Sequence, residues 1–287
     1  MLSPPLKWAG GKRWLVPLLQ TIWDPDCRLV EPFVGGMAVA LGLQPQRAVL
    51  NDWNPHLVNF YRWLQQGLTI GIPLHNDSDY YYHCRATFNE LIANQAHTSQ
   101  PAAELFYYLN RTCYNGLCRF NSRNQYNVPF GRYKTIHYTH DFGSYLKQVS
   151  QWDLSCGDFA HLALRPDDFI YADPPYDVPF TRYSARDFDW DDQQRLADWL
   201  SHHQGPVIVS NQATDRILEL YRSLHFGILV VPAPRRIACT GDRSPALEML
   251  AYKGIPIETV TRLKTAVAAA QLRPAAKSKR SPARIES

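Results

Sequence analysis

The segment Tyr171-Ala172-Asp173-Pro174-Pro175-Tyr176 combines residue types that suit recognition of a planar amine. It continues the apolar run Phe169-Ile170-Tyr171, which predicts a short buried strand with the motif at its carboxyl end. Two consecutive prolines cannot donate to a sheet ladder, so they end the strand in a rigid extended turn. The carboxylate and a bare carbonyl can then accept two N–H bonds from an exocyclic amine, such as that of a nucleobase, while the ring stacks on its face. The competing interpretation is a proline-rich loop without chemistry.

A glycine segment near the N-terminus, Leu6-Lys7-Trp8-Ala9-Gly10-Gly11-Lys12-Arg13, precedes a helical pattern and is similar to a phosphate-binding loop. The phosphate-loop pattern fails because Arg13 stands where a Ser or Thr is needed and Leu6 where the first glycine belongs. What remains is a loop that lets a ligand approach the backbone between an aromatic ring and a cation.

Two predicted strands end in residues typical of a nucleoside site. Leu29-Val30-Glu31-Pro32-Phe33-Val34-Gly35-Gly36 indicates a strand that ends in a glycine turn, and Ala48-Val49-Leu50 a second strand that ends in Asn51-Asp52. A glycine turn after one strand, and an acid about twenty residues further on after the next, is the arrangement of an adenosine-type cofactor site. Asp52 would bind the ribose hydroxyls. The competing interpretation is an ordinary turn, because the dinucleotide glycine spacing is absent.

The segment from residue 105 to residue 140 contains no acidic residue. Arg, Asn, Lys and Tyr are interleaved there with Gly and Pro, most densely over 109–121 and 127–134. Such side chains can neutralise phosphates, pair with base edges and place an aromatic wedge between bases. We therefore predict a nucleic-acid surface, with a solvated polar loop as the alternative.

The elements that must position these residues predict an α/β fold with a mostly parallel sheet. Strands are expected near residues 29, 48, 154, 169, 207 and 227, separated by helical stretches, with a further late strand over 247–252. The segment 56–140 breaks this alternation and reads as an insertion between two halves of one sheet. Because ligands of open α/β sheets bind at the carboxyl ends of the strands, Asp52, Asp158 and Asp173 are expected to share one pocket.

Composition restricts the class of protein further. The 287 residues can bury a substantial core, and a net charge of +4 does not by itself indicate nucleic acid. Six scattered cysteines without zinc spacing predict free thiols in a reducing compartment. There is no signal peptide and no apolar run near the roughly 18 residues of a membrane span, which predicts a soluble, cytoplasmic protein. From about Arg262 the chain is Ala-rich and basic, so residues 262–287 are predicted to form a disordered tail.

Three motifs together resemble the Dam-type, or class alpha, DNA adenine-N6 methyltransferases, which use S-adenosylmethionine. They are the glycine segment from Leu6 to Lys12, the segments 115–119 and 127–133 of the insertion, and Asp173-Pro174-Pro175-Tyr176. Their order also matches that family: a cofactor half, a recognition insertion and a catalytic half. The resemblance implies a Rossmann-like catalytic domain formed by residues 1–55 and 141–261. Residues 56–140 would be an inserted, mainly helical DNA-recognition domain.

The resemblance also implies roles for individual residues, with Asp52 on the ribose and Asp158 and Phe159 at the adenine end of the cofactor. The implied cofactor set is Trp8, Gly10, Lys12, Phe33, Gly35, Asp52, Asp158, Phe159 and Asp173. The implied catalytic set, which would hold a flipped adenine, is Asp173, Pro174, Pro175 and Tyr176. Within the set implied to face DNA, Arg119 is similar to an arginine that reads guanine and Tyr114 to an intercalating wedge. That set is Arg111, Tyr114, Asn115, Leu117, Arg119, Asn121, Asn127, Pro129, Arg132, Tyr133 and Lys134.

The expected activity is transfer of a methyl group from S-adenosylmethionine to N6 of adenine in double-stranded DNA, with GATC as the implied site and S-adenosylhomocysteine as product. No metal, no membrane and no obligatory protein partner is expected, and the enzyme would work in the cytoplasm on nucleoid DNA. Two alternatives stay open. One is methylation of cytosine N4 or of adenine in RNA; the other is a DNA-binding regulator without catalysis.

Overall fold

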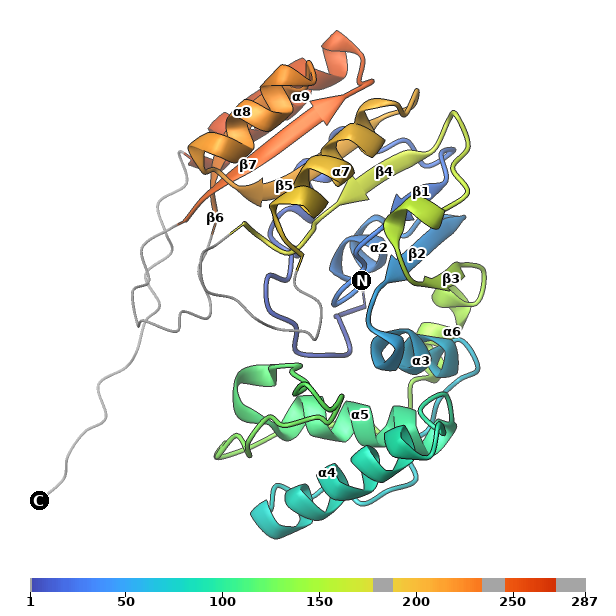
Figure 1. The fold of residues 1–287 in the computed structure, drawn as a ribbon. Helices are drawn as coiled ribbons and strands as arrows, with labels where there is room; N and C mark the ends of the chain where they lie inside the picture. The colour runs from blue at the N-terminus through green and yellow to red at the C-terminus, as the bar shows by residue number, and fades with distance from the viewer. Residues whose placement is uncertain (1, 178–187, 234–245, 272–287) are drawn as a thin grey trace, which may run out of the picture.

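A computed structural model describes residues 2–177, 188–233 and 246–271 of the chain. These residues form a seven-stranded sheet in the order β3-β2-β1-β4-β5-β7-β6 (Figure 1). Strands β3, β2, β1, β4 and β5 are parallel to one another, whereas β7 is antiparallel to both β5 and β6. The predicted α/β fold with a mostly parallel sheet is therefore confirmed. The strands are β1 (Leu29–Glu31), β2 (Ala48–Asp52), β3 (Asp153–Cys156), β4 (Phe169–Ala172), β5 (Val207–Gln212), β6 (Gly227–Ala233) and β7 (Ala246–Lys253).

The central strands are buried on both faces, as their apolar runs predict. All residues of β1 and β4 are buried, which is typical of parallel strands covered by helices on both sides. A buried ion pair fixes the two strands side by side: Arg28, just before β1, donates from Nε and Nη2 to Asp168, just before β4, over 2.8 and 2.7 Å. This ion pair aligns β1 and β4 along the sheet. The residues that follow the two strands are therefore aligned as well.

Helices cover both faces of the sheet (Figure 1). The core on one face includes residues of α1, α2 and α9, and the core on the other face residues of α7 and α8. Strand alternation divides β5 between them, because Ile208 contributes to the first core and Val209 to the second. The helices are α1 (Val16–Leu19), α2 (Ala38–Leu43), α7 (Trp190–Ser201), α8 (Asp215–Ser223) and α9 (Ile257–Gln271).

The segment between β2 and β3 adds a second, mainly helical lobe below the sheet in Figure 1. Helices α3, α4 and α5 begin at side-chain caps: Asn54 accepts from the backbone N–H groups of His56 and Leu57, Asp77 from Tyr80, and Ser99 from Ala102. One hydrophobic core runs without a break from β1 and β2 into this lobe. The helices are α3 (Pro55–Leu64), α4 (Ser78–Ala93), α5 (Gln100–Thr112) and α6 (Gly143–Val149).

The predicted nucleic-acid segment begins within α5, and its part after Thr112 forms neither a long helix nor a strand. It contains the single 3₁₀ turn η1 (Tyr114–Gly116) and the isolated bridges Cys113↔Phe130 and Phe120↔Tyr126. Buried hydroxyl groups hold it to the helices, since Tyr81 of α4 donates to the carbonyl of Val128 over 2.8 Å. These polar residues therefore lie on an irregular loop that packs on the helices of the second lobe.

The prediction of a disordered tail from residue 262 is wrong for its first part, because residues 262–271 belong to α9. Val260, Leu263 and Val267 are buried, and their spacing places them on one helix face. This face packs on α1 and β6, so burial of apolar side chains outweighs the basic, Ala-rich composition. The remainder of the predicted tail, residues 272–287, lies outside the described residues.

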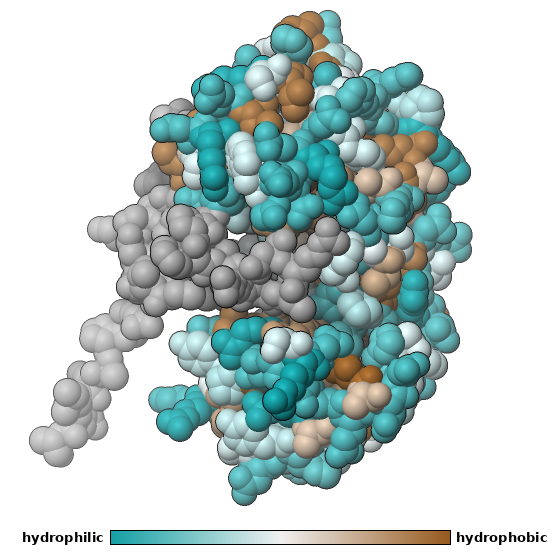
Figure 2. Space-filling view, in the orientation of Figure 1, coloured by the Kyte–Doolittle hydropathy of each residue, from teal (hydrophilic) through white to brown (hydrophobic). Residues whose placement is uncertain are grey.

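The face shown in Figure 2 is mostly hydrophilic, with hydrophobic residues in small, separate patches. Throughout the described ranges, no helix is both long and apolar enough to cross a bilayer. The cysteines of the described part of the chain are free thiols, as predicted.

Candidate active site

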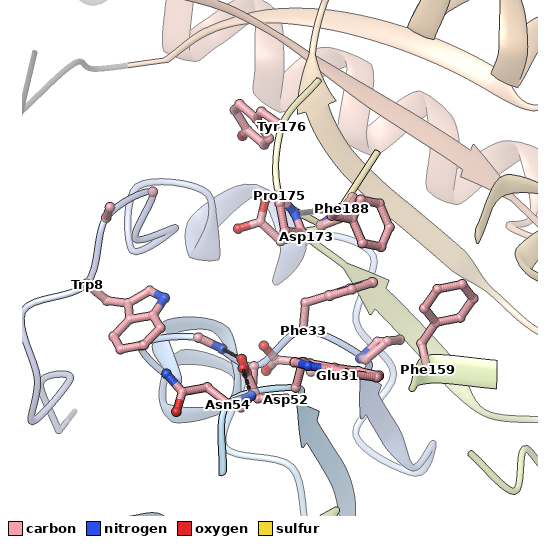
Figure 3. Close-up of a pocket in the computed structure, with 18 of the residues that line it drawn as sticks. Trp8, Glu31, Phe33, Asp52, Asn54, Phe159, Asp173, Pro175, Tyr176 and Phe188 are labelled. Atoms are coloured by element: carbon pink, nitrogen blue, oxygen red, sulfur yellow. Dashed lines mark hydrogen bonds between the residues drawn. The ribbon is translucent and has the colours of Figure 1, made fainter. Parts of the chain in front are cut away.

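One pocket of about 1220 Å³ opens across the carboxyl ends of β1, β2, β3 and β4 (Figure 3). Segment 8–12 forms one wall, and the second lobe contributes Gly116, Leu117 and Cys118. Asp52 and Asp173, which are far apart in the sequence, therefore open into the same space. All residues expected at the cofactor or in catalysis line this pocket: Trp8, Gly10, Lys12, Phe33, Gly35, Asp52, Asp158, Phe159, Asp173, Pro174, Pro175 and Tyr176.

Asp52 ends β2 with a carboxylate that the backbone holds in place. Its Oδ2 accepts from the N–H of Gly35 over 3.0 Å, and its Oδ1 accepts from the N–H of Asn54 over 3.0 Å. Burial raises the pKa of Asp52, and the N–H donors of Asn54, Gly35 and Trp53 act in the opposite direction. Each oxygen keeps acceptor capacity toward the pocket, so a pair of neighbouring hydroxyl groups can be bound there.

The glycine turn after β1 lies directly beneath Trp8. Gly35 has φ +45°, and a Cβ atom on it would lie 2.9 Å from Nε1 of Trp8. A Cβ on Gly36 would come equally close to the Cβ of Trp8, at 2.9 Å. Glycine is therefore required twice, because a side chain at either position would push the indole ring away from the pocket wall.

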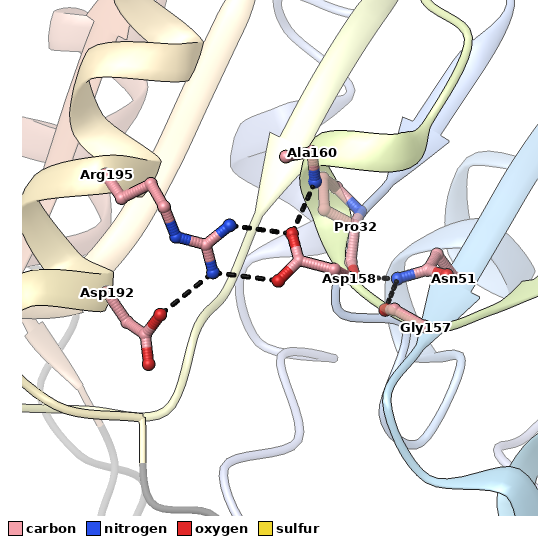
Figure 4. A network of polar contacts seen from close by, with 7 residues as sticks. All are labelled: Pro32, Asn51, Gly157, Asp158, Ala160, Asp192 and Arg195. Carbon is pink, nitrogen blue, oxygen red and sulfur yellow. Dashed lines mark hydrogen bonds and ion pairs between the residues drawn. The ribbon is translucent and has the colours of Figure 1, made fainter.

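A buried amide joins the loops that follow three neighbouring strands (Figure 4). Asn51 Nδ2 donates to the carbonyls of Pro32 and Gly157 over 2.9 and 3.0 Å. These two bonds fix the loop after β1 and the loop after β3 against the end of β2. The hydrogen bond to the Gly157 carbonyl therefore helps to position Asp158, the next residue.

Asp158 takes part in a charged network with α7 (Figure 4). Arg195 donates from Nη1 and Nη2 to the two carboxylate oxygens of Asp158, both over 2.8 Å, and its Nη2 also contacts Asp192. This arginine lowers the pKa of Asp158, mainly through those hydrogen bonds. The guanidinium group also lies over the ring of Phe159, 4.3 Å from the centroid. Asp158 is thus an ionised acceptor at the rim of the pocket.

Aromatic rings line the same end of the pocket (Figure 3). The ring of Phe33 lies 5.7 Å from that of Phe159 and 5.5 Å from that of Phe188, between centroids. An apolar wall beside a fixed carboxylate suits a flat heterocycle with an amino group.

The Asp173 carboxylate lies beside a buried ammonium group. Lys12 Nζ is 3.0 Å from Asp173 Oδ1 and 4.0 Å from Glu248 Oε2, and it donates to the carbonyl of Gly10 over 2.9 Å. The same ammonium lies 4.9 Å from the ring centroid of Tyr176. Lysine, carboxylate and ring are therefore held together on the side of the pocket away from Asp52.

Two acids near the Asp173 carboxylate were not anticipated. Glu31, the last residue of β1, is buried, and burial raises its pKa well above the usual range, with a further contribution from Asp173. Its Oε1 has no hydrogen-bond partner among the described residues. Its place at a strand end is the same signal that identifies Asp52. Glu248 comes from β7, and burial raises its pKa too; its sequence neighbourhood gave no indication of a role.

Other pocket residues were also missed by sequence reasoning. Trp53, beside Asp52, is 51% exposed and lines the pocket. Phe188, Trp190 and Arg195 reach it from the start of α7. Only the folded chain brings that helix to the rim.

The residues expected to face DNA fall into two groups. Tyr114, Asn115, Pro129, Arg132 and Lys134 are exposed on the loop after α5. The others are partly covered and make contacts within the loop: Arg111, Leu117, Arg119, Asn121, Asn127 and Tyr133. Leu117 also lines the pocket, which makes this loop continuous with the site.

Hydrogen bonds orient several of the covered residues. Arg119 donates from Nε to Asn127 Oδ1 over 2.8 Å and from Nη2 to the Asn127 carbonyl over 3.3 Å. Asn121 Oδ1 accepts from the N–H groups of Arg123 and Gln125 and so closes a turn. Asn121 thus has a local structural role here, whereas Asn127 supports the arginine.

The N-terminal segment is attached to this loop through Lys7. Its backbone N–H and carbonyl form two hydrogen bonds of 2.8 Å with the side chain of Asn110. Its Nζ donates to the carbonyl of Arg111 over 2.7 Å and lies 3.6 Å from the ring centroid of Tyr133. Burial, together with the neighbouring Arg111, lowers the pKa of Lys7 to about 8. The second lobe and the glycine segment are therefore joined through Lys7.

No group of three or more metal-ligating side chains occurs in the ranges that the structure describes.

The described residues thus form an α/β fold with a pocket at the carboxyl ends of its central strands. The model of the D12 class N6 adenine-specific DNA methyltransferases matches residues 8–237, and the chain belongs to this family. The chain is 35% identical over 277 residues to the DNA adenine methylase of Escherichia coli strain K12, covering 86% of this chain and 94% of that protein. It is 33% identical over 267 residues to the retron Ec67 DNA adenine methylase of Escherichia coli, covering 88% and 92%. The DNA N-6-adenine-methyltransferase of Escherichia phage P1 is 35% identical over 254 residues, which are 82% of this chain and 33% of the phage protein.

Proposed function

We propose that the protein transfers the methyl group of S-adenosylmethionine to N6 of an adenine that is flipped out of duplex DNA, within the sequence GATC. The observation that carries the proposal is the shared pocket: Asp52 and Asp173 open into one space that Leu117 of the recognition loop also lines. In this proposal neither a metal ion nor an obligatory protein partner takes part, S-adenosylhomocysteine is the product, and the substrate is cellular DNA.

The donor set of the pocket fits S-adenosylmethionine. Asp52 offers two fixed acceptors for the ribose hydroxyls, and Asp158 offers an acceptor for the adenine amine beside Phe159. Glu31 offers an unpartnered oxygen, within the described residues, to a positively charged group. When bound, the cofactor supplies a sulfonium methyl group that the amine nitrogen of the target attacks in line.

The target base would use the other side of the pocket. At about 1220 Å³, the pocket is larger than the roughly 300–1,000 Å³ of a typical single-ligand site, so it has room for a second planar ligand. Adenine would stack on Tyr176, with its N6 hydrogens bonded to the Asp173 carboxylate and the Pro174 carbonyl. Both bonds draw the nitrogen toward tetrahedral geometry and localise its lone pair. Asp173 can also accept the proton that N6 loses when the new C–N bond forms, because its carboxylate already accepts a hydrogen bond from that N–H group.

Changing Asp173 to Ala tests the assignment. Because the variant lacks the main acceptor for the amine, we expect methyl incorporation from labelled S-adenosylmethionine into a GATC duplex to fall by at least about 100-fold. Binding of the duplex, measured by gel shift, should stay within a few fold. Turnover of the variant near the rate of the unchanged enzyme would refute the role of Asp173.

The identity of the acceptor atom is tested separately on the unchanged enzyme. Nucleoside chromatography of digested product should give N6-methyladenine from GATC duplexes and little from duplexes with one altered base pair. Detection of N4-methylcytosine, or of methylated adenine from RNA alone, would show that the proposed substrate is wrong. Failure to bind labelled S-adenosylmethionine would instead favour a DNA-binding regulator.

A further inference from the structure

Two consecutive polar residues of β5, Ser210 and Asn211, lie fully buried near the centre of the sheet. Buried polar groups are costly unless they are hydrogen-bonded. Successive side chains of a strand point to opposite faces, and Ser210 and Asn211 accordingly make contacts on different sides of the sheet. Both lines of contacts lead to the turn Asp173-Pro174-Pro175-Tyr176.

On one face, Ser210 holds one oxygen of the Asp173 carboxylate. The Ser210 hydroxyl donates to Asp173 Oδ1 over 2.8 Å and shares a hydrogen bond of 2.8 Å with the hydroxyl of Tyr171. Lys12 Nζ contacts the same Oδ1 at 3.0 Å. Oδ1 therefore accepts a hydrogen bond from Ser210 and lies beside Lys12, whereas no residue of the described part of the chain donates a hydrogen bond to Oδ2.

On the other face, Asn211 acts through Gln193 of α7, which is also fully buried. Asn211 Nδ2 donates to Gln193 Oε1 over 3.0 Å, and Gln193 Nε2 donates to the carbonyl of Pro175 over 2.8 Å. Pro175 therefore has its carbonyl engaged away from any ligand. The Pro174 carbonyl receives no hydrogen bond from the residues that the structure describes.

We propose that Ser210, and Gln193 supported by Asn211, are positioning residues that select Asp173 Oδ2 and the Pro174 carbonyl as the pair of acceptors for the target amine. The inference rests on the proposed function and deepens it. The turn needs such support because its two prolines have no N–H with which the backbone could fix them. Side chains from both faces of the sheet replace the missing backbone bonds, and they occupy the acceptors that the amine does not use.

Ser210→Ala and Gln193→Leu test this inference, with Ser99→Ala and Gln65→Leu as matched controls. Ser99 caps α5, and Gln65 donates to the carbonyls of Val149 and Trp152, so each control loses buried or capping hydrogen bonds away from the turn. With saturating S-adenosylmethionine and GATC duplex, the single-turnover rate should fall about 10- to 100-fold in the test variants. It should stay within about 3-fold in the controls.

Three further measurements distinguish a positioning role of these residues from a purely structural one. In the test variants KM for cofactor and for duplex should stay within about 3-fold, and the fluorescence rise of 2-aminopurine at the target position should persist, because the base still leaves the stack. A crystal structure of Ser210→Ala should show the Asp173 carboxylate rotated. Unchanged single-turnover rates, equal losses in the controls, or an unrotated carboxylate would overturn the inference.

These outcomes are distinct from failure of the proposed function. If the unchanged enzyme methylates another exocyclic amine, the proposed substrate is wrong, and the same rate comparison on that amine still tests the positioning residues. If it transfers no methyl group at all, the orientation of Asp173 in the Ser210→Ala crystal decides the inference alone.

Discussion

Arg119 illustrates how a single side chain can be prepared for recognition. Asn127 holds its guanidinium group through Nε and Nη2 and so fixes the plane of the fork. In the proposed function this fork would pair with guanine O6 and N7. We expect Arg119→Ala to lose about 1–3 kcal/mol of discrimination at one base pair. Methylation rates on GATC duplexes and on duplexes altered at each position measure this loss.

The matched control for Arg119 is Arg123, which is exposed in the turn closed by Asn121. Arg123→Ala should weaken methylation of all duplexes to a similar extent or not at all, because a phosphate contact carries no sequence information. An unchanged sequence preference in Arg119→Ala would exclude it as a reader of a base.

His56 is a buried residue whose protonation should affect stability. Its ring stacks on Phe120 at 4.8 Å between centroids, and no described residue bonds its Nδ1. Burial, with a smaller contribution from His97, lowers the pKa of His56 to about 4. The folded pKa is below the unfolded value near 6.5, so the unfolded state takes up the proton first. Stability should therefore fall as the pH falls from about 6.5 to about 4.

His56→Phe should remove that pH dependence. We expect the unchanged protein to lose about 2 kcal/mol from this histidine between pH 7.5 and pH 5, and the variant to lose correspondingly less. Urea unfolding at the two pH values measures the difference. Equal pH slopes of stability in His56→Phe and the unchanged protein would contradict the prediction.

At the scale of elements, α9 shows that a helix with an Ala-rich end can still belong to the core. Leu263 is 1% exposed within the core that α1 also joins. Leu263→Ala should reduce the free energy of unfolding by about 2–5 kcal/mol because it leaves a cavity. Chemical denaturation measures this loss, and Lys264→Ala, one residue further and exposed, should change stability by less than about 0.5 kcal/mol. Equal effects of the two substitutions would argue against packing of α9.

At the scale of the whole molecule, the two lobes share one core. Buried side chains continue from Leu29 and Leu50 of the sheet through Phe60 of α3 to Phe88 and Phe106 of the second lobe. The contacts of the Lys7 backbone with Asn110 add a polar connection. The second lobe is therefore joined to the sheet by more than its two chain crossings.

We expect the lobes to unfold together. Calorimetry should show a single transition, with a calorimetric enthalpy close to the van't Hoff enthalpy, because separating the lobes would expose apolar surface in both. Two resolved transitions, or proteolytic release of a folded fragment near residues 65–140, would show that the second lobe is an independent unit.

Much of this architecture could be predicted from the sequence alone. The apolar run before Asp173, the glycine turn after β1 and the acid that ends β2 each depend on neighbours within a few residues, and local pattern is sufficient there. The common pocket followed from one rule, that parallel strands present their carboxyl ends at one edge. The loop after α5 was identified by its composition, since the lack of acids is visible without a structure.

Tertiary structure alone decided which atoms are available for chemistry. Ser210 and Gln193 carry no motif, and they reach the Asp-Pro-Pro-Tyr turn only because β5 lies beside β4 and α7 covers the sheet. Glu248 enters the site from an antiparallel strand, and α9 is a helix because α1 and β6 bury one of its faces. Burial and hydrogen-bond partners are properties of neighbours in space. The sequence therefore determined which groups meet at the sheet edge, and the fold determined which of their acceptors remain open.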